Sequence, residues 1–188
     1  DGAGILIQIP DAFLRKNCAA RGVALPPAGE YGVGMVFLPR AATARSTCER
    51  VLADKIAAEG LTLLGWRDVP VDNSGLGESV KASEPVVRQV FVGRGNALKD
   101  ADSFERKLFV GRKITEHAVH ALPEEYKRGF YIPSLSSRTI VYKGMLLADQ
   151  VGKYYPDLRD KSVVSALALV HQRFSTNTFP TWNLAHPF

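Results

Sequence analysis

The chain has 188 residues, of which 46% are hydrophobic and 23% are charged, so it is long enough to bury a core and is not a disordered polar sequence. Its net charge of +5 comes from lysines and arginines spread along the chain, which does not indicate a nucleic-acid partner. The longest apolar run, residues 166–170, is far too short to span a bilayer, so no membrane partner is expected.

Strands and helices are mixed along the chain, and this mixture predicts an α+β fold with antiparallel sheets covered by helices. Runs rich in apolar and β-branched residues between turn residues predict the strands, and caps and apolar spacing predict the helices. The expected strands are residues 4–9, 31–38, 61–66, 85–92, 131–135, 139–146 and 163–174. The expected helices are residues 11–21, 43–59 and 102–121, with a short one near 145–154.

The longest of these helices carries the clearest start signal. Asp102 followed by Glu105 is the spacing of a capping box, in which two side chains satisfy the free N–H groups at a helix start. We therefore expect Asp102 to cap the helix at 102–121.

Several residues that often serve chemistry have an ordinary structural interpretation here. Cys18 and Cys48 lie on apolar stripes of expected helices, as small buried thiols do, and two cysteines make neither a disulfide framework nor a metal site. His117 and His120 are three residues apart but lack a third ligand, so no metal site is expected. The glycine pairs complete no phosphate-binding motif.

The end of the chain is chemically the most distinctive part. The apolar run 163–170 predicts a buried strand, and Arg173, Phe174, Ser175, Thr176 and Asn177 follow at its end. A guanidinium can hold a carboxylate through two parallel N–H bonds, and the hydroxyl and amide groups beside it can complete the shell. This set suits a small ligand that carries both a carboxylate and an ammonium group, such as an amino acid.

The same run carries a resemblance to a known family. Residues 171–188, His-Gln-Arg-Phe-Ser-Thr-Asn-Thr-Phe-Pro-Thr-Trp-Asn-Leu-Ala-His-Pro-Phe, closely resemble the glutaminase domain of glutamate synthases, a class II glutamine amidotransferase domain. Residues 1–10, 29–39 and 131–145 agree with it, so the resemblance covers the whole chain. In this family the nucleophilic cysteine comes before the segment that begins here at Asp1. The chain therefore resembles an internal piece of the domain.

The resemblance implies a fold and a set of site residues. The fold is the N-terminal-nucleophile type, a four-layer αββα sandwich of two antiparallel sheets, and residues 1–188 would be a single, incomplete domain. Arg173 would hold the α-carboxylate of L-glutamine, with Phe174, Ser175, Thr176 and Asn177 around it. Related amidotransferases often have Trp at the position of Phe174 and His at that of Asn177. No catalytic residue and no metal ligand is expected in the chain, which contains no N-terminal cysteine.

The resemblance also implies the activity of a parent enzyme. That enzyme would hydrolyse L-glutamine to glutamate and ammonia and pass the ammonia to 2-oxoglutarate, which is reductively converted to glutamate. It would use FMN, an iron–sulfur cluster and NADPH or ferredoxin, with no cofactor held by this chain. Its partners would be the rest of the synthase polypeptide and a small reductase subunit, and its location cytoplasmic or plastid. We expect the isolated chain to be inactive.

Two other hypotheses remain open at this point. The chain could be a non-catalytic amino-acid-binding module that keeps the Arg173 pocket, or a structural subunit without a ligand.

Overall fold

A computed structural model describes residues 2–173 and 179–185 of the chain. The strands are β1 (Gly2–Gln8), β2 (Tyr31–Leu38), β3 (Thr62–Asp68), β4 (Val86–Gly93), β5 (Tyr131–Ser136), β6 (Thr139–Gly144) and β7 (Ala168–Arg173). The helices are α1 (Asp11–Ala19), α2 (Ala42–Ala58), α3 (Glu78–Ala82), α4 (Ala101–His120), α5 (Glu124–Lys127) and α6 (Ala148–Tyr154), with a 3-10 turn, η1 (Pro156–Arg159).

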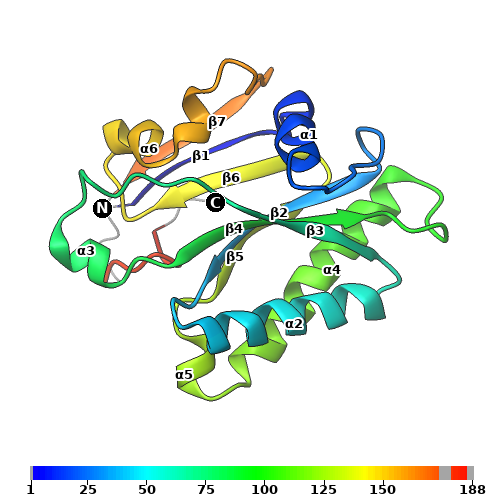
Figure 1. Ribbon diagram of the computed structural model, residues 1–188, viewed down its shortest axis with the longest axis horizontal. Coiled ribbons are helices and arrows are strands. Elements are labelled where there is room, and N and C mark those ends of the chain that lie inside the picture. The colour runs from blue at the N-terminus through cyan, green and yellow to red at the C-terminus, as the bar shows by residue number, and fades with distance from the viewer. Residues whose placement is uncertain (1, 174–178, 186–188) are drawn as a thin grey trace.

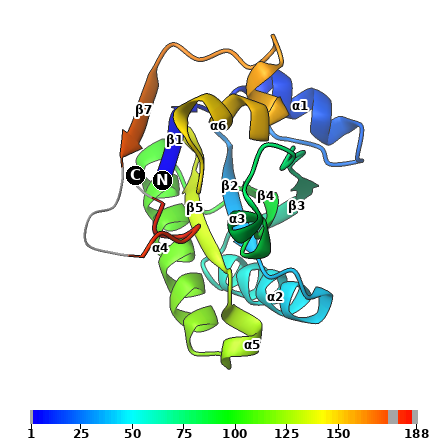
Figure 2. The same ribbon diagram turned by 90° about the vertical axis from the view of Figure 1, so that its left-hand side faces the viewer.

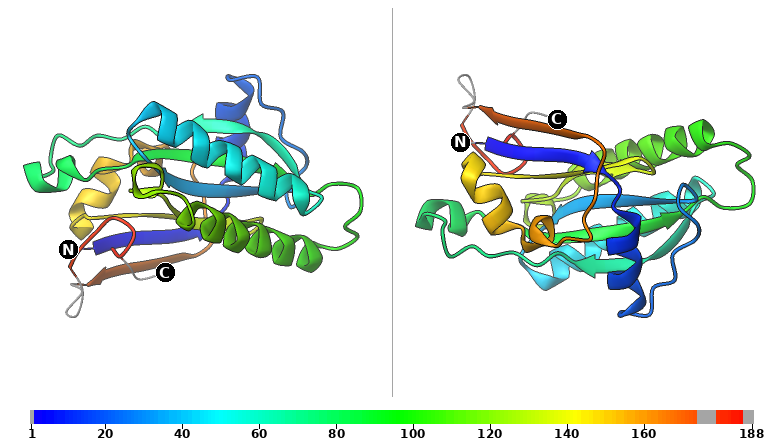
Figure 3. Two further views of the ribbon diagram at one scale, coloured as in Figure 1. Left: turned by 90° about the horizontal axis from the view of Figure 1, so that it is seen from below. Right: turned by 90° about the horizontal axis from the view of Figure 1, so that it is seen from above.

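The strands form two antiparallel sheets. Sheet A has the order β6-β1-β7, and sheet B has the order β3-β4-β2-β5. Helices α2 and α4 lie along one side of the sheets, and α1 and α6 lie on the other (Figures 1 and 2). The views from below and above in Figure 3 show the two helical sides in turn. The predicted α+β fold with two antiparallel sheets and helical layers is therefore confirmed.

Two cores hold these layers together, and β2 contributes to both. Successive residues of a strand point to opposite faces, so Met35 packs into the core between the two sheets while Val36 packs against α2 and α4. Every residue of β2 is buried. Gly32 allows α4 to approach this strand, because a Cβ atom there would lie 2.6 Å from Cδ1 of Leu108. The strand is thus the centre of the fold.

The predicted strands 131–135 and 139–146 correspond to β5 and β6, but the two belong to different sheets. The short connection carries the chain from sheet B to sheet A. Glu105 of α4 holds this connection, since its carboxylate accepts hydrogen bonds from Oγ of Ser136 at 2.5 Å and from the backbone N–H and Oγ of Ser137 at 2.8 and 2.6 Å.

This role of Glu105 explains why the predicted cap of α4 is wrong. The helix begins one residue earlier than expected, and its N-cap is Asp100, whose carboxylate accepts a hydrogen bond from the backbone N–H of Ser103 at 2.7 Å. Asp102 instead pairs with Arg138. The carboxylates of Asp102 and Glu105 therefore bind residues of the β5–β6 connection and do not cap the helix.

The last strand also differs from its prediction. We expected a buried strand within 163–174, whereas β7 begins at Ala168 and is largely exposed, with Leu169 56% and Val170 68% accessible. Its apolar residues belong to neither core, and β7 pairs with β1 alone among the strands that the structure describes. Sheet A therefore has an open apolar edge.

Candidate functional site

Arg173 is the one member of the predicted ligand-binding set whose position the structure describes. It is the last residue of β7, is exposed, and lies opposite Gly2 of β1 in the antiparallel ladder. The other predicted members, Phe174, Ser175, Thr176 and Asn177, lie outside the described residues. Arg173 therefore stands at the end of sheet A, where the prediction placed a polar strand end.

The surface of sheet A beside Arg173 is shaped by glycines. Residues directly opposite each other in a ladder share a face, so Gly2 lies on the Arg173 face, and Gly4 lies on it two positions further along β1. Gly4 is opposite His171 on one side and Lys143 on the other. A Cβ atom at Gly4 would lie 2.7 Å from Cβ of Lys143, so β1 and β6 approach each other more closely than side chains would allow.

Residues 181–185, the return arm, pack against the same end of the sheet. A Cβ atom at Gly2 would lie 2.9 Å from Cα of Ala185, which places Ala185 directly against the residue that pairs with Arg173. Trp182 is buried, and its ring lies 6.0 Å from that of Phe37 and 5.5 Å from that of Tyr154. The sequence at 181–185 gave no sign of this docking.

Lys143 of β6 lies beneath the return arm and is completely buried. Its Nζ donates a hydrogen bond to the backbone carbonyl of Asn183 at 2.9 Å and lies 4.5 Å from the centre of the Tyr131 ring. Burial, and next the charge of Arg112, lowers the pKa of Lys143 to about 8. Sequence reasoning did not single out this lysine.

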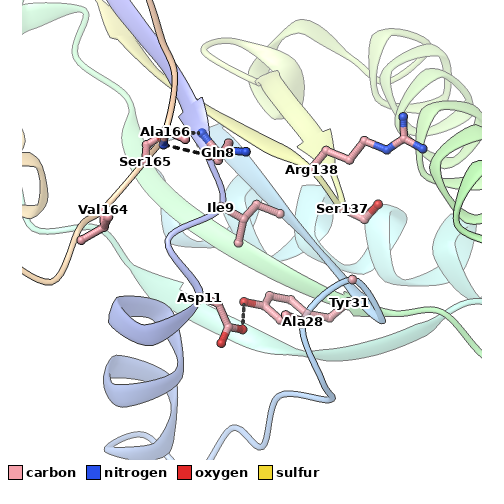
Figure 4. A pocket seen from close by; sticks show the side chains of 11 residues that line it. Gln8, Ile9, Asp11, Ala28, Tyr31, Ser137, Arg138, Val164, Ser165 and Ala166 are labelled. Atoms are coloured by element: carbon pink, nitrogen blue, oxygen red, sulfur yellow. Dashed lines mark hydrogen bonds between the residues drawn. The ribbon is translucent and has the colours of Figure 1, made fainter.

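A cavity with polar residues in its wall lies at the opposite end of β1 and has a volume of about 420 Å³ (Figure 4). Its acidic group is already neutralised, because the Asp11 carboxylate accepts hydrogen bonds from Tyr31 Oη at 2.9 Å and from Arg15 at 2.8 Å. Arg138 lines the cavity but pairs with Asp102 of α4. The charged groups around this cavity therefore satisfy one another.

The two cysteines have the properties expected of structural thiols. Cys18 is buried on α1 and Cys48 on α2, and burial raises the pKa of each to about 11. Thiols with such pKa values are protonated near neutral pH and are poor nucleophiles. Cys48 donates a hydrogen bond to the carbonyl of Tyr126 instead.

Comparison with known proteins decides the family. The chain matches the family described as "Glutamine amidotransferases class-II" over residues 1–188. The chain belongs to the class II glutamine amidotransferases. The resemblance seen in the sequence is thereby confirmed.

Relatives of this amidotransferase chain are glutamate synthases. It is 52% identical over 187 residues to the "Glutamate synthase [NADPH] large chain" of Bacillus subtilis (strain 168), and 42% identical over 189 residues to the protein of the same name from Azospirillum brasilense. It is also 42% identical over 189 residues to "Ferredoxin-dependent glutamate synthase 2, chloroplastic" of Arabidopsis thaliana. Each match covers 100% of this chain but only 12%, 12% and 11% of the relative.

Among residues 2–173 and 179–185, the possible donor groups do not fit an iron–sulfur cluster or another metal. The two buried cysteines stand on separate helices, and His117 and His120 are exposed at the end of α4. No three His, Cys, Asp or Glu side chains gather closely enough to hold a metal ion in the part of the chain that the structure describes. Within residues 2–173 and 179–185, no helix is both long and apolar enough to cross a bilayer.

Proposed function

We propose that residues 1–188 form a single, partial glutaminase domain of a glutamate synthase and bind L-glutamine at the end of sheet A. The observation that carries the proposal is the place of Arg173 in a class II amidotransferase chain. Arg173 is exposed at the end of β7, opposite Gly2, on which Ala185 packs. A carboxylate can approach it there and accept two parallel hydrogen bonds.

The predicted residues have different roles around this contact. Arg173 receives the α-carboxylate of glutamine, and Phe174, Ser175, Thr176 and Asn177 follow it directly in sequence and contribute short polar groups and one ring. Because Cys18 and Cys48 are buried and protonated, neither serves as the nucleophile. The attacking thiol comes from polypeptide outside residues 1–188.

The whole protein then hydrolyses glutamine to glutamate and passes ammonia to 2-oxoglutarate for reductive formation of glutamate. FMN and an iron–sulfur cluster, supplied with electrons by NADPH or ferredoxin, carry the redox chemistry in other parts of the polypeptide, and a small reductase subunit is a partner. The named relatives are NADPH- or ferredoxin-dependent synthases, which supports this assignment and does not favour a non-catalytic binding module. Bacterial and chloroplastic relatives support a cytoplasmic or plastid location.

Glutamine affinity of the full-length protein with Arg173→Ala tests the proposal. Loss of a charge-assisted hydrogen bond pair costs about 1.5–3 kcal/mol, so the Kd for glutamine should rise by roughly 10- to 150-fold in a calorimetric titration. Arg173→Lys should recover part of the affinity, because an ammonium keeps the charge but not the bidentate geometry.

Arg50→Ala is the matched control. Arg50 is an exposed arginine on α2, on the helical side of sheet B, and its removal should leave glutamine affinity unchanged. Equal glutamine affinities for Arg173→Ala and Arg50→Ala would contradict the proposal.

A further inference from the structure

The return arm, residues 181–185, is held together by its own short hydrogen bonds. The backbone N–H of Ala185 donates to the carbonyl of Thr181 at 2.8 Å, and that of Leu184 donates to Oγ1 of Thr181 at 3.3 Å. Oγ1 of Thr181 in turn donates to Oδ1 of Asn183 at 2.6 Å. The arm is therefore a compact turn with its own hydrogen bonds.

Two contacts fix where this turn sits. Trp182 anchors one side of it in the core between the sheets, close to Gly144, where a Cβ atom would lie 2.5 Å from the indole. Ala185 rests on Gly2, on the face of sheet A that carries the Arg173 side chain. The arm thus lies beside the end of β7, and its position sets the space next to the Arg173 guanidinium.

Lys143 is the polar contact between sheet A and the arm. Among the described residues, the carbonyl of Asn183 accepts its hydrogen bond, and no carboxylate forms an ion pair with it. A buried ammonium without a carboxylate is costly, and the Tyr131 ring face and one carbonyl offset only part of that cost. A buried Met of similar length would fill the same space without this cost, so packing alone does not account for a lysine here.

We propose that Lys143 is a positioning residue that holds the return arm against Gly2, so that the arm forms one wall of the carboxylate site at Arg173. This inference rests on the proposed function, because it gives the arm a role only if glutamine binds at Arg173. Lys143 does not touch glutamine. It acts through the Asn183 carbonyl, and glutamine affinity depends on it for that reason.

Lys143→Met in the full-length protein tests the inference with two independent measurements. The first is hydrogen exchange at the amides of Leu184 and Ala185, which should become at least roughly tenfold faster while exchange in β2 stays unchanged. The second is steady-state glutaminase kinetics at neutral pH. The KM for glutamine should rise by roughly tenfold while kcat changes much less, as expected when a wall of the binding site is displaced.

Two further variants make the test specific. Lys153→Met removes an exposed lysine that pairs with Asp149 on α6, and both measurements should remain at wild-type values. Gly2→Ala leaves Lys143 intact but pushes Ala185 away, so it should raise the glutamine KM as Lys143→Met does. If Lys143→Met fails to fold, the glutamine KM of Gly2→Ala still tests whether the arm is a wall of the site.

The outcomes separate the two proposals. Unchanged exchange in the arm of Lys143→Met overturns the anchoring role. Faster exchange with an unchanged glutamine KM overturns the idea that the arm is a wall of the site. If the wild-type protein does not bind glutamine, the proposed function fails, whereas the exchange measurement still reports on the anchor.

Discussion

At the scale of single residues, Arg67 and Asp157 form a buried ion pair. The guanidinium of Arg67 makes two hydrogen bonds to the Asp157 carboxylate, at 2.6 and 2.7 Å, and both side chains are almost inaccessible. Gln89 accepts a further bond from Arg67 at 2.9 Å, and Tyr142 donates one to Asp157 at 3.3 Å. This network joins β3, β4, β6 and η1 in the core between the sheets.

Asp157→Ala should destabilise the protein by about 3–5 kcal/mol, because it leaves a buried guanidinium without its counter-charge. The double variant Arg67→Met/Asp157→Leu should lose much less, since it removes both charges. Urea denaturation measures the difference. Asp149→Ala, which breaks an exposed pair with Lys153, serves as the control and should cost about 0–1 kcal/mol. Similar losses for Asp157→Ala and Asp149→Ala would be inconsistent with this account.

Lys143 makes the unfolding free energy depend on pH. Its pKa is about 8 in the folded protein and near its ordinary value of 10.5 in the unfolded chain. Between these values the unfolded state holds a proton that the folded state has released, so stability rises with pH across this window. The gain is on the order of 3 kcal/mol when complete and is lost again as pH falls through 8.

The Lys143→Met variant should lack this contribution. We expect the difference in unfolding free energy between wild type and Lys143→Met to shift in favour of the wild type between pH 7.5 and pH 10, as measured by urea midpoints. Comparing the two proteins cancels the titration of the cysteines and tyrosines. A difference that does not change with pH would show that the ammonium is not desolvated in the fold.

At the scale of elements, α4 does more than cover sheet B. Its first turns hold the β5–β6 connection through Glu105 and Asp102, while its buried stripe packs on β2 through Leu108. The start of the helix and the corner between the two sheets are therefore fixed together.

Glu105→Ala should destabilise the fold by about 1.5–3 kcal/mol, the range for hydrogen bonds to a charged group, because Ser136 and Ser137 lose their acceptor. Glu105→Gln should recover part of the loss. Asp102→Asn, at an exposed ion pair, should change stability by less than about 1 kcal/mol. Thermal unfolding of the three variants decides the prediction, and a larger effect for Asp102→Asn than for Glu105→Ala would refute it.

At the scale of the whole molecule, the open edge of sheet A is the prominent surface feature. Leu167, Leu169 and Val170 are 46%, 56% and 68% accessible, and a cavity of about 680 Å³ lies between β7 and α6. Exposed apolar edge strands pair readily with other chains.

The purified 188-residue chain should therefore self-associate as its concentration rises, and Val170→Lys should reduce this association by placing a charge on the strand. Sedimentation velocity at several concentrations measures both effects. Arg50→Ala, which changes an exposed residue of α2 on the helical side of sheet B, should behave like the wild type. A wild-type chain that stays monomeric at every concentration would contradict the expectation.

The sequence by itself determined the local elements and the family. The apolar run at 31–38 and the helical spacing of Phe104 and Leu108 are local patterns, and the strand and helix that they predict agree with β2 and α4. The polar residues after β7 and the resemblance at 171–188 were also visible in the residues alone. Arg173 was placed at a strand end for this reason.

The tertiary structure decided the relations between distant parts of the chain. Whether 168–173 is buried depends on what packs across it, and whether Glu105 caps its own helix depends on Ser136 and Ser137, some thirty residues away. The burial of Lys143 depends likewise on the return arm around Asn183. A local pattern contains no information about such partners, because burial and hydrogen bonding are properties of the packed molecule rather than of a segment.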